Sequence, residues 1–239
     1  MTAEFVTKAK GEIMRFEADT HSHTLASGHA YSTIKEMAAA AEAKGLKALA
    51  LTEHAPKMPG TCSELYFNNL RVLERKHGEM YTLFGAELNI MDMEGHVDLP
   101  ERTLKQMDLC VASMHGPCFH PGTIEENTKT YLNVMKNPYV NIIGHPDDSY
   151  YPVDYRALVE GAKEHHVLLE VNNGSLTPGG FRQNTKENSC KMLELCKEYK
   201  VPVIMDSDAH VDTAVGNHQY PLEVIQMVDF PEELVVNTN

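Results

Sequence analysis

The chain has 239 residues, of which 42% are hydrophobic and 23% are charged, so it can bury one sizeable hydrophobic core. Its 21 basic and 34 acidic residues give a formal charge of −13, which repels a polyphosphate backbone and excludes long nucleic acid as the expected partner. The longest apolar runs fall far short of the roughly 18 residues that a membrane helix needs, and the N-terminus lacks the apolar segment of a secretory signal, so we expect a cytoplasmic protein with no membrane partner.

Short apolar segments alternate along the chain with amphipathic helical patterns. Strands are expected at residues 16–18, 48–51, 82–84, 109–112, 140–143, 167–171 and 201–205. Helical spacing of apolar residues predicts helices over 34–41, 124–135 and 155–162, with further helices near 63–77 and 187–199. Thr123 and Glu126 have the spacing of a capping box, and Glu94-Gly95 is expected to turn a small hairpin within residues 89–100.

This alternation predicts a parallel sheet covered by helices, either as an open sheet or as a barrel. No repeat and no Gly/Ser-rich linker interrupts the sequence, so we expect one domain over residues 1–239. The five cysteines are scattered without a C-x-x-C pair, which is typical of core thiols in a reducing compartment.

Residues with metal-binding side chains follow the predicted strands. In chain order they are Asp19, His21, His23 and His29; Glu53 and His54; Glu87; His115; His145 and Asp147; Asn172 and Asn173; and Asp206, Asp208 and His210. Because the carboxyl ends of parallel strands meet on one face, these side chains are expected to line one pocket.

Each motif by itself is a weak signal. His21 and His23 are two residues apart in an extended segment and therefore point to the same side, as do Asp208 and His210, but solvated polar residues at a strand end would look the same. Their recurrence after successive strands favours a metal site with nine protein ligands, seven imidazoles and two carboxylates, which suits two or three ions. The remaining histidines are expected to be structural or solvated, with His77, His165 and His166 at helix C-termini.

These motifs resemble the PHP (polymerase and histidinol phosphatase) family of metal-dependent phosphoesterases, most closely its YcdX-like branch of small single-domain phosphatases. The resemblance extends from about Met14 to Phe230 and rests on Asp19-Thr20-His21-Ser22-His23-Thr24, residues 26–33, Thr52-Glu53-His54, Gly85-Ala86-Glu87-Leu88-Asn89, His115-Gly116-Pro117, Gly144-His145-Pro146, residues 170–173 and Ser207-Asp208-Ala209-His210. It implies an α/β fold, a distorted (β/α)7 TIM-like barrel with a trinuclear metal site at the C-terminal ends of the strands. Residues 1–13 are then expected to be an N-terminal extension.

The resemblance also implies which residues hold each ion. His21, His23, Glu87 and Asp208 would bind the first ion, Glu87 would bridge to a second ion held by His115 and His145, and His29, His54 and His210 would bind the third. Zinc is the expected metal, and manganese or iron also suits these ligands. The family usually has Asp where this chain has Glu53, so the longer side chain is expected to displace that carboxylate or to change the ion selectivity.

The resulting hypothesis is a metal-dependent phosphatase that hydrolyses phosphomonoesters with a metal-bound hydroxide and no side-chain nucleophile. Arg182 and Lys57 are candidate phosphate contacts, and the expected substrate is a small phosphorylated metabolite or a mononucleotide. The alternatives are a barrel hydrolase of C–N bonds, disfavoured because no Lys follows a strand at the carbamylation position, a PHP phosphodiesterase or exonuclease, and a non-catalytic metal-binding protein. The sequence gives no indication of the oligomeric state.

Overall fold

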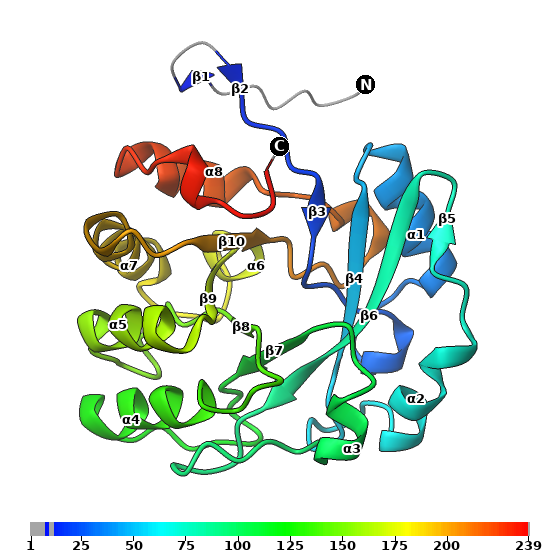
Figure 1. Cartoon of the computed structure of the whole chain (residues 1–239), viewed down its shortest axis with the longest axis horizontal. Coiled ribbons are helices and arrows are strands. Elements are labelled where there is room, and N and C mark those ends of the chain that lie inside the picture. Colours follow the sequence, from blue (N-terminus) through cyan, green and yellow to red (C-terminus); the bar gives the residue numbers. More distant parts are fainter. Residues whose placement is uncertain (1–7, 10–11, 239) are drawn as a thin grey trace.

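The structure is a computed structural model that describes residues 8–9 and 12–238. Strands β1 (Lys8–Ala9) and β2 (Glu12–Ile13) pair with each other in a small antiparallel sheet, apart from the main sheet (Figure 1). The other residues of the expected N-terminal extension, 1–7, 10 and 11, lie outside the described residues.

A parallel sheet forms an almost closed barrel, as predicted (Figure 1). Its seven parallel strands follow the chain order and are β3 (Ala18–Asp19), β4 (Ala48–His54), β6 (Met80–Asn89), β7 (Cys110–Ser113), β8 (Ile142–Ile143), β9 (Leu168–Asn172) and β10 (Val203–Asp206). Each corresponds to a predicted strand, although β3, β8 and β10 begin two residues later than expected. An eighth strand, β5 (Lys76–His77), pairs antiparallel with the start of β6.

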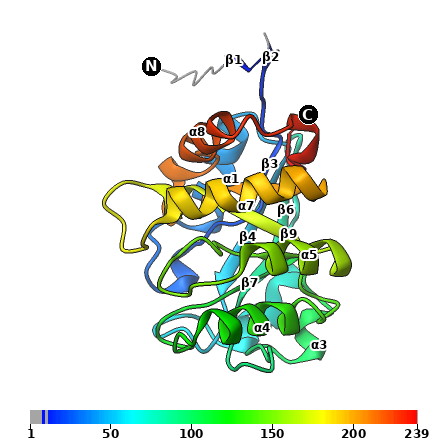
Figure 2. The same cartoon turned by 90° about the vertical axis from the view of Figure 1, so that its left-hand side faces the viewer.

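Helices cover the outside of this sheet, and Figure 2 shows α4, α5 and α7 side by side. The helices are α1 (Ile34–Ala43), α2 (Glu64–Asn69), α3 (Glu101–Leu104), α4 (Ile124–Val134), α5 (Tyr155–His165), α6 (Asn173–Leu176), α7 (Thr185–Tyr199) and α8 (Gln219–Met227), with short 3-10 turns at η1 (Leu25–Ser27), η2 (Leu70–Val72), η3 (Asp212–Ala214) and η4 (Glu232–Leu234). The predicted capping box is present, because Glu126 N–H donates to Thr123 and the Glu126 carboxylate accepts from Thr123 N–H. Every helix among the described residues is too short or too polar to traverse a lipid bilayer.

The core fills the barrel and the space between the sheet and the helices, with large buried side chains such as Leu49, Phe84 and Leu169. Of the five free cysteines, Cys110 and Cys196 are buried as expected of core thiols, and the other three are half-buried. Burial raises the pKa of Cys110 to about 12, which keeps this thiol protonated and unreactive.

The prediction of a helix over 63–77 is wrong in its second half. Helix α2 ends at Asn69, and His77 lies in strand β5 rather than at a helix C-terminus. Gly78, at a φ of 57°, turns the chain between β5 and β6, a conformation that glycine adopts without strain and that the helical pattern did not reveal. The predicted hairpin is confirmed, because Ile90 pairs antiparallel with Val97 around a turn at Gly95.

Side chains and C-terminal residues close the seam between β3 and β10. The side-chain amide of Asn237 lies between the strands, donating to Ala18 O (2.9 Å) and Met205 O (2.5 Å) and accepting from Met205 N–H (3.2 Å). Closer to the C-terminal face, Thr20 N–H donates to Asp206 Oδ1 (2.5 Å). The loops that follow β3 and β10 are therefore held next to each other, and these loops carry four of the predicted metal ligands.

Candidate metal centre

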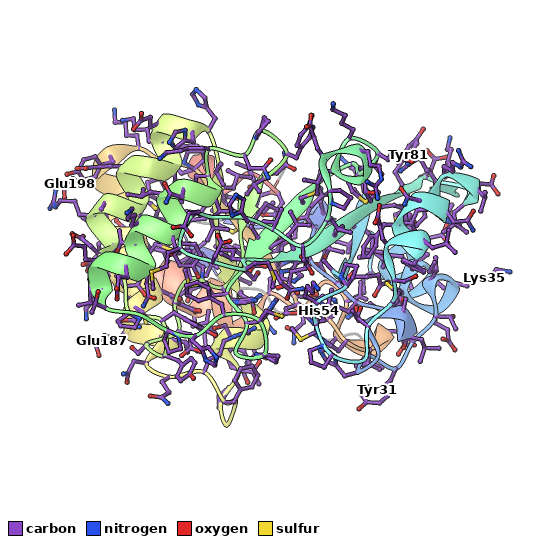
Figure 3. The ribbon with its side chains drawn as sticks, turned by 90° about the horizontal axis from the view of Figure 1, so that it is seen from below. Tyr31, Lys35, His54, Tyr81, Glu187 and Glu198 are labelled. Carbon is purple, nitrogen blue, oxygen red and sulfur yellow. The ribbon has the colours of Figure 1, made fainter. Side chains whose placement is uncertain are left out.

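The structure brings all nine predicted ligands together at the C-terminal ends of the strands. His54 is the last residue of β4 and lies near the middle of the face seen in Figure 3, between the side of α1 and α2 and the side of α4, α5 and α7. The others lie within β6 or in the loops after η1, β3, β7, β8 and β10, and are His21, His23, His29, Glu87, His115, His145, Asp208 and His210. Their convergence agrees with the expected pocket, and their role as ligands stays a prediction.

Glu87 lies at the centre of this cluster and is 1% exposed. Its Oε1 atom faces the Nε2 atoms of His145 (3.0 Å), His115 (3.1 Å) and His21 (3.4 Å). Its Oε2 atom faces His54 Nδ1 (2.5 Å) and His23 Nε2 (3.6 Å). Both oxygens thus have imidazole neighbours, which is the arrangement that a bridging carboxylate requires.

Three groups of donor atoms are compact enough to hold an ion, with all atoms of each group within 4.8 Å of one another. They are His21 with His23 and Asp208; His54 with Glu87 and His115; and His23 with His54 and His210. The first agrees with the implied first ion. His54 is closer to the centre than the resemblance implies, because its Nδ1 faces Glu87 while its Nε2 lies 3.1 Å from His29 Nε2.

The partners of the other ring nitrogens determine which nitrogen of each imidazole is free. His21 Nδ1 lies 2.7 Å from Glu170 Oε1, and His210 Nδ1 lies 2.9 Å from Asp208 O. His115 Nδ1 lies 2.7 Å from Asn89 Oδ1. This atom of the Asn89 amide is the oxygen, because the other atom, Nδ2, donates to Ala55 O and to Asp98 Oδ2. Carboxylates and carbonyls only accept, so Nδ1 carries the proton and Nε2 offers its lone pair to the cluster.

Ser27 sets the tautomer of His23 in the same way. The single proton of the Ser27 hydroxyl goes to Glu53 Oε2, 2.6 Å away. Ser27 Oγ must then accept from its other neighbours, His54 N–H (3.1 Å) and His23 Nδ1 (3.1 Å). His23 Nδ1 is therefore protonated, and its Nε2 faces the other ligands.

Glu53 does not face the ligand cluster. Its carboxylate accepts from Thr24 N–H (3.0 Å), Thr24 Oγ1 (2.5 Å) and Ser27 Oγ, with Tyr66 OH at 3.4 Å. One carboxylate spans Thr24 and Ser27. Glu53 thus supports the loop that carries His23 and orders Ser27.

Glu170 supports the cluster from strand β9, a role that its place in the sequence did not predict. Besides His21, its carboxylate accepts from His145 N–H (2.7 Å) and from the side-chain amide of Asn172 (3.0 Å). The same amide donates to Asp208 Oδ2 (3.2 Å). The available signal was a charged residue inside the apolar run of a central strand, since parallel strands are buried on both faces.

Burial and neighbouring charges keep several of the predicted ligands in the protonation states that metal binding needs. His21 differs, because burial acts to lower its pKa but Glu170, Glu87 and Asp208 hold it well above the ordinary value, so a cation bound at Nε2 would have to displace a proton. Burial lowers the pKa of His115 to about 4, and burial together with His54 and His210 holds the pKa of His23 well below its ordinary value. Burial acts to raise the pKa of Glu87 and Asp208, but the adjacent histidines hold both well below the usual range. Neutral imidazoles and ionised carboxylates are the forms that ligate cations.

The cluster leaves buried polar atoms without partners. His21 Nε2 and His23 Nε2 are buried and have no hydrogen bond within the described residues. His54 Nδ1 and Glu87 Oε2 are also buried and lie 2.5 Å apart, but neither forms a hydrogen bond of acceptable geometry within these residues. Several buried carboxylates surround these atoms, whereas no Lys or Arg side chain within residues 14–238 is fully buried. Buried ligand atoms without hydrogen bonds, next to more buried carboxylates than basic side chains, fit a group of bound cations.

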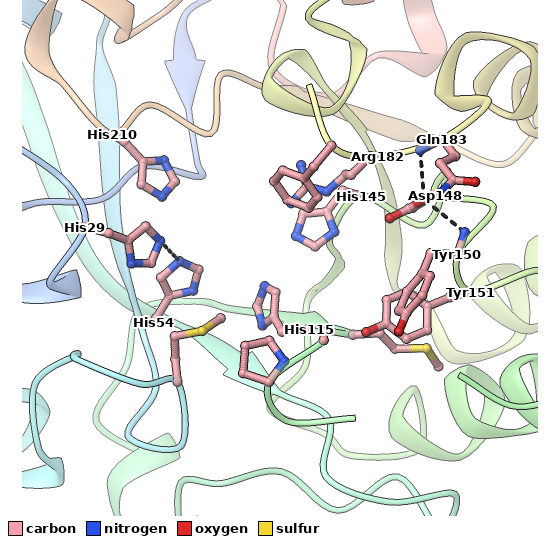
Figure 4. Close-up of a pocket in the computed structure, with 15 residues that line it drawn as sticks. His29, His54, His115, His145, Asp148, Tyr150, Tyr151, Arg182, Gln183 and His210 are labelled. Atoms are coloured by element: carbon pink, nitrogen blue, oxygen red, sulfur yellow. Dashed lines mark hydrogen bonds between the residues drawn. The ribbon is translucent and has the colours of Figure 1, made fainter. Parts of the chain in front are cut away.

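A cavity of about 650 Å³ opens beside the cluster (Figure 4). Its lining comprises His29, His54, Met58, Met114, His115, Gly116, Pro117, His145, Asp148, Tyr150, Tyr151, Phe181, Arg182, Gln183 and His210. Of the two predicted phosphate contacts, Arg182 lines this cavity, with NH1 3.4 Å from Asp208 Oδ2. The side chain of Lys57 is exposed, and Lys57 is not among the lining residues.

Comparison with known proteins places this site in a family. Residues 19–230 match the model of the PHP domain. A protein of Caldicellulosiruptor saccharolyticus, named a probable phosphatase, is 45% identical over 224 residues, which cover 94% of this chain and 92% of the relative. A probable phosphatase of Clostridium novyi is 45% identical over 226 residues, covering 95% and 92%.

The fold is similar to that of the histidinol phosphate phosphatase of Lactococcus lactis, which was solved in complex with zinc, L-histidinol and phosphate. That structure has a TM-score of 0.62 and 17% identity, and the match covers 90% of this chain and 94% of that chain. The similarity supports the barrel fold, and the domain match confirms the resemblance inferred from the motifs. The chain therefore belongs to the PHP domain family.

Proposed function

We propose that this protein is a phosphatase that hydrolyses small phosphomonoesters, with three divalent cations bound by the nine clustered residues. The observation that carries the proposal is the set of buried nitrogen and oxygen atoms without hydrogen bonds, within the described residues, next to a cavity lined by Arg182. The names of its close relatives, probable phosphatases, point to the same activity.

His21, His23, Asp208 and Glu87 would hold the proposed first ion, and Glu87 would also contribute to a second position with His115 and His145. His29, His54 and His210 would hold the third. Zinc is proposed because imidazole dominates the donor set, and manganese or iron also suits it. When bound, the cations would supply charge for the phosphate oxygens and lower the pKa of a coordinated water, the proposed nucleophile.

Arg182 is proposed to bind the phosphate. Its side chain is 12% exposed, and beyond NH1 its donors are available to the cavity. The loop around it is fixed, because Gln183 N–H donates to Asp148 Oδ1 (2.9 Å) and Ser149 N–H donates to Gln183 O (2.9 Å). The guanidinium is thus positioned for the bidentate contact that phosphate favours.

A covalent mechanism through cysteine is disfavoured. Cys118, three residues after His115, is half-buried, and burial raises the pKa of its thiol to about 11. The thiolate fraction at neutral pH is therefore very small, and the thiol is a poor nucleophile. This favours direct attack by water.

The cavity also separates the proposed activity from the alternatives. A metal-storage site is expected to be closed, whereas this cluster borders an open cavity of about 650 Å³, a size typical of small-molecule sites. A C–N hydrolase with a carbamylated lysine would need a Lys in the cavity wall, and the lining contains none among the described residues. A small substrate rather than a polynucleotide also suits the charge of −13.

The test is the hydrolysis of p-nitrophenyl phosphate by protein with a measured metal content, before and after chelation and after the addition of zinc or manganese. We expect turnover that chelation abolishes and metal restores, with bis(p-nitrophenyl) phosphate hydrolysed far more slowly. Full metal occupancy without turnover of the monoester would refute the proposal. Faster hydrolysis of the diester would favour the phosphodiesterase alternative.

A further inference from the structure

The part of the cavity away from the third-ion histidines has a different chemical character. Figure 4 shows His29, His54 and His210 on one side, His115 and His145 in the middle, and Tyr150 and Tyr151 on the opposite side. Met58, Met114, Pro117 and Phe181 add apolar surface to the lining. We infer that this aromatic side binds the leaving group, and that the preferred substrates are phosphomonoesters of aromatic alcohols that carry no second anionic group. The inference rests on the proposed phosphatase function.

Tyr151 forms a fixed aromatic wall. Its side chain is 6% exposed, and its hydroxyl donates to Phe119 O (3.1 Å), so the polar end of the side chain is already satisfied. The ring packs edge to face with Tyr150, with centroids 4.9 Å apart and an interplanar angle of 82°. Such a pair presents a rigid apolar surface that an aromatic ring can contact at little entropic cost.

Phe181 offers a second aromatic surface, which is 85% exposed although it lines the cavity. Arg182 lies over its ring, with the guanidinium carbon 5.1 Å from the centroid. An aromatic ring in the substrate would remove part of this exposed apolar surface from water, and that burial is favourable. Phe181 therefore lies next to the residue proposed to bind the phosphate and is suited to contact the first atoms of the leaving group.

Asp148 limits the charge that this part of the cavity accepts. Its Oδ1 accepts from Tyr150 N–H (3.0 Å) and Gln183 N–H (2.9 Å), which fixes the carboxylate in the lining. Within the described residues, Arg182 is the only Lys or Arg in the lining, and the phosphate is proposed to occupy it. A second phosphate or a carboxylate on the leaving group would thus meet Asp148 without a compensating cation, and like charges repel.

The first test compares 2-phenylethyl phosphate with ethyl phosphate, whose leaving alcohols are chemically alike apart from the ring. We expect kcat/KM to be at least about tenfold higher for the phenyl compound, since one extra methylene in an apolar pocket already gives about tenfold. Calorimetry with the matching non-hydrolysable phosphonates should show the same preference in Kd. A ratio near one in both measurements, or hydrolysis of neither ester by protein that turns over p-nitrophenyl phosphate, would overturn the inference while leaving the phosphatase function standing. Metal-loaded protein that hydrolyses none of the three esters would refute the phosphatase function itself.

Variants locate the preference. Tyr150→Ala and Phe181→Ala should each lower the phenyl-to-ethyl ratio several-fold. Tyr81→Ala is the control, because the side chain of Tyr81 is 50% exposed and that of Tyr150 is 48% exposed. Tyr81 lies on β6 away from His54 (Figure 3), so this variant should leave the phenyl-to-ethyl ratio unchanged. Metal content and circular dichroism are measured for each variant. Ratios that stay at the wild-type value in both cavity variants would show that the aromatic side does not bind the leaving group.

The charge limit has its own isosteric test. A para-carboxylate on the phenyl ring of the substrate should lower kcat/KM by about tenfold. This is the order of magnitude expected for repulsion between two like charges, here the added carboxylate and Asp148, in a partly buried site. Asp148→Asn keeps the oxygen that accepts from Tyr150 and Gln183, so it should restore much of this loss without moving the loop. Equal loss in the wild type and in Asp148→Asn would contradict the role of Asp148.

Discussion

The Ser27→Ala variant tests whether the supporting hydrogen bonds orient the ligands. Ser27 is fully buried in η1, and its hydroxyl contacts the Glu53 carboxylate, His23 Nδ1 and the backbone N–H of His54. The substitution removes one oxygen atom and leaves the carbon framework in place. Its consequences therefore follow from hydrogen bonds rather than from packing.

The magnitude follows from the groups that lose their partner. His54 N–H and His23 Nδ1–H would both be buried without an acceptor, and each such loss costs about 1–3 kcal/mol. We expect the free energy of unfolding to fall by about 2–4 kcal/mol, because part of this cost is relieved by local relaxation. His23 would also lose the acceptor that fixes its tautomer, and loss of such a partner weakens metal binding by about 10–100-fold.

The assay is a competition titration of chelated protein with zinc, accompanied by urea unfolding. Ser189→Ala is the matched control, because Ser189 is equally buried and donates to a carboxylate, Asp147 Oδ2 (3.0 Å), away from the ligand nitrogens. We expect the control to lose stability and to keep its zinc affinity. If Ser27→Ala binds zinc within twofold of wild type, the hydroxyl does not orient His23 and the argument from its single proton is wrong.

Three further outcomes are expected. Chelation should lower the melting temperature and metal should restore it, because the buried carboxylates lose their compensating charge, and calorimetry of the stripped and reloaded protein measures this shift. Arg182→Ala should lower kcat/KM for p-nitrophenyl phosphate by about 10–100-fold, since a charged hydrogen bond contributes about 1.5–3 kcal/mol. Lys57→Ala should keep kcat/KM within twofold of wild type. Equal losses in the two variants would contradict the placement of Arg182 at the phosphate. His218 is buried and its ring stacks on Phe16, with the ring centroids 4.0 Å apart. Burial lowers the pKa of His218, so the unfolded chain takes up a proton at a higher pH than the folded protein does. The contribution of neutral His218 to the free energy of unfolding is therefore present above the ordinary pKa of 6.5 and is lost as the pH falls below it. Between pH 7 and pH 5, chelated wild-type protein should therefore lose stability more steeply than His218→Phe in urea titrations, by at most about 1.4 kcal/mol per pH unit, and parallel slopes would refute this.

The strand order and the convergence of the nine residues could be predicted because both depend on local patterns. Apolar runs marked every parallel strand, and parallel strands bring their carboxyl ends to one face whatever the details of packing. The motif around His21 and His23 needed only the two-residue period of an extended chain. The position of Glu87 could also be predicted, because it follows the apolar run that marks its strand, β6.

The supporting residues could not be assigned roles because their partners are distant in sequence. His115 and Asn89 meet across two strands, and the contact depends on the register of β6 with β7 and on the amide orientation. The same is true of Glu170, which reaches His21 from 149 residues away. The aromatic side of the cavity comes from loops, including those of Tyr150 and Phe181, whose paths no periodicity encodes. Side-chain hydrogen bonds across a barrel are thus a property of the assembled fold.

The two segments at the barrel seam explain why the site forms there. Residues 19–23 and 206–210 share one pattern, an Asp followed at two-residue intervals by two predicted ligands. Each Asp reaches across the seam to the other segment, because Asp19 accepts from Ser207 N–H (3.0 Å) and Asp206 accepts from Thr20 N–H (2.5 Å).

The backbones then pair beyond the strands, through His23 N–H to Ala209 O (2.8 Å) and Asp208 N–H to His21 O (3.0 Å). β3 and β10 do not pair along their length, so these contacts join the two sheet edges just beyond the strands and bring the predicted ligand pairs face to face. Closure of the barrel and assembly of the proposed first-ion site are therefore the same structural event, and a cation bound by both segments would stabilise the seam.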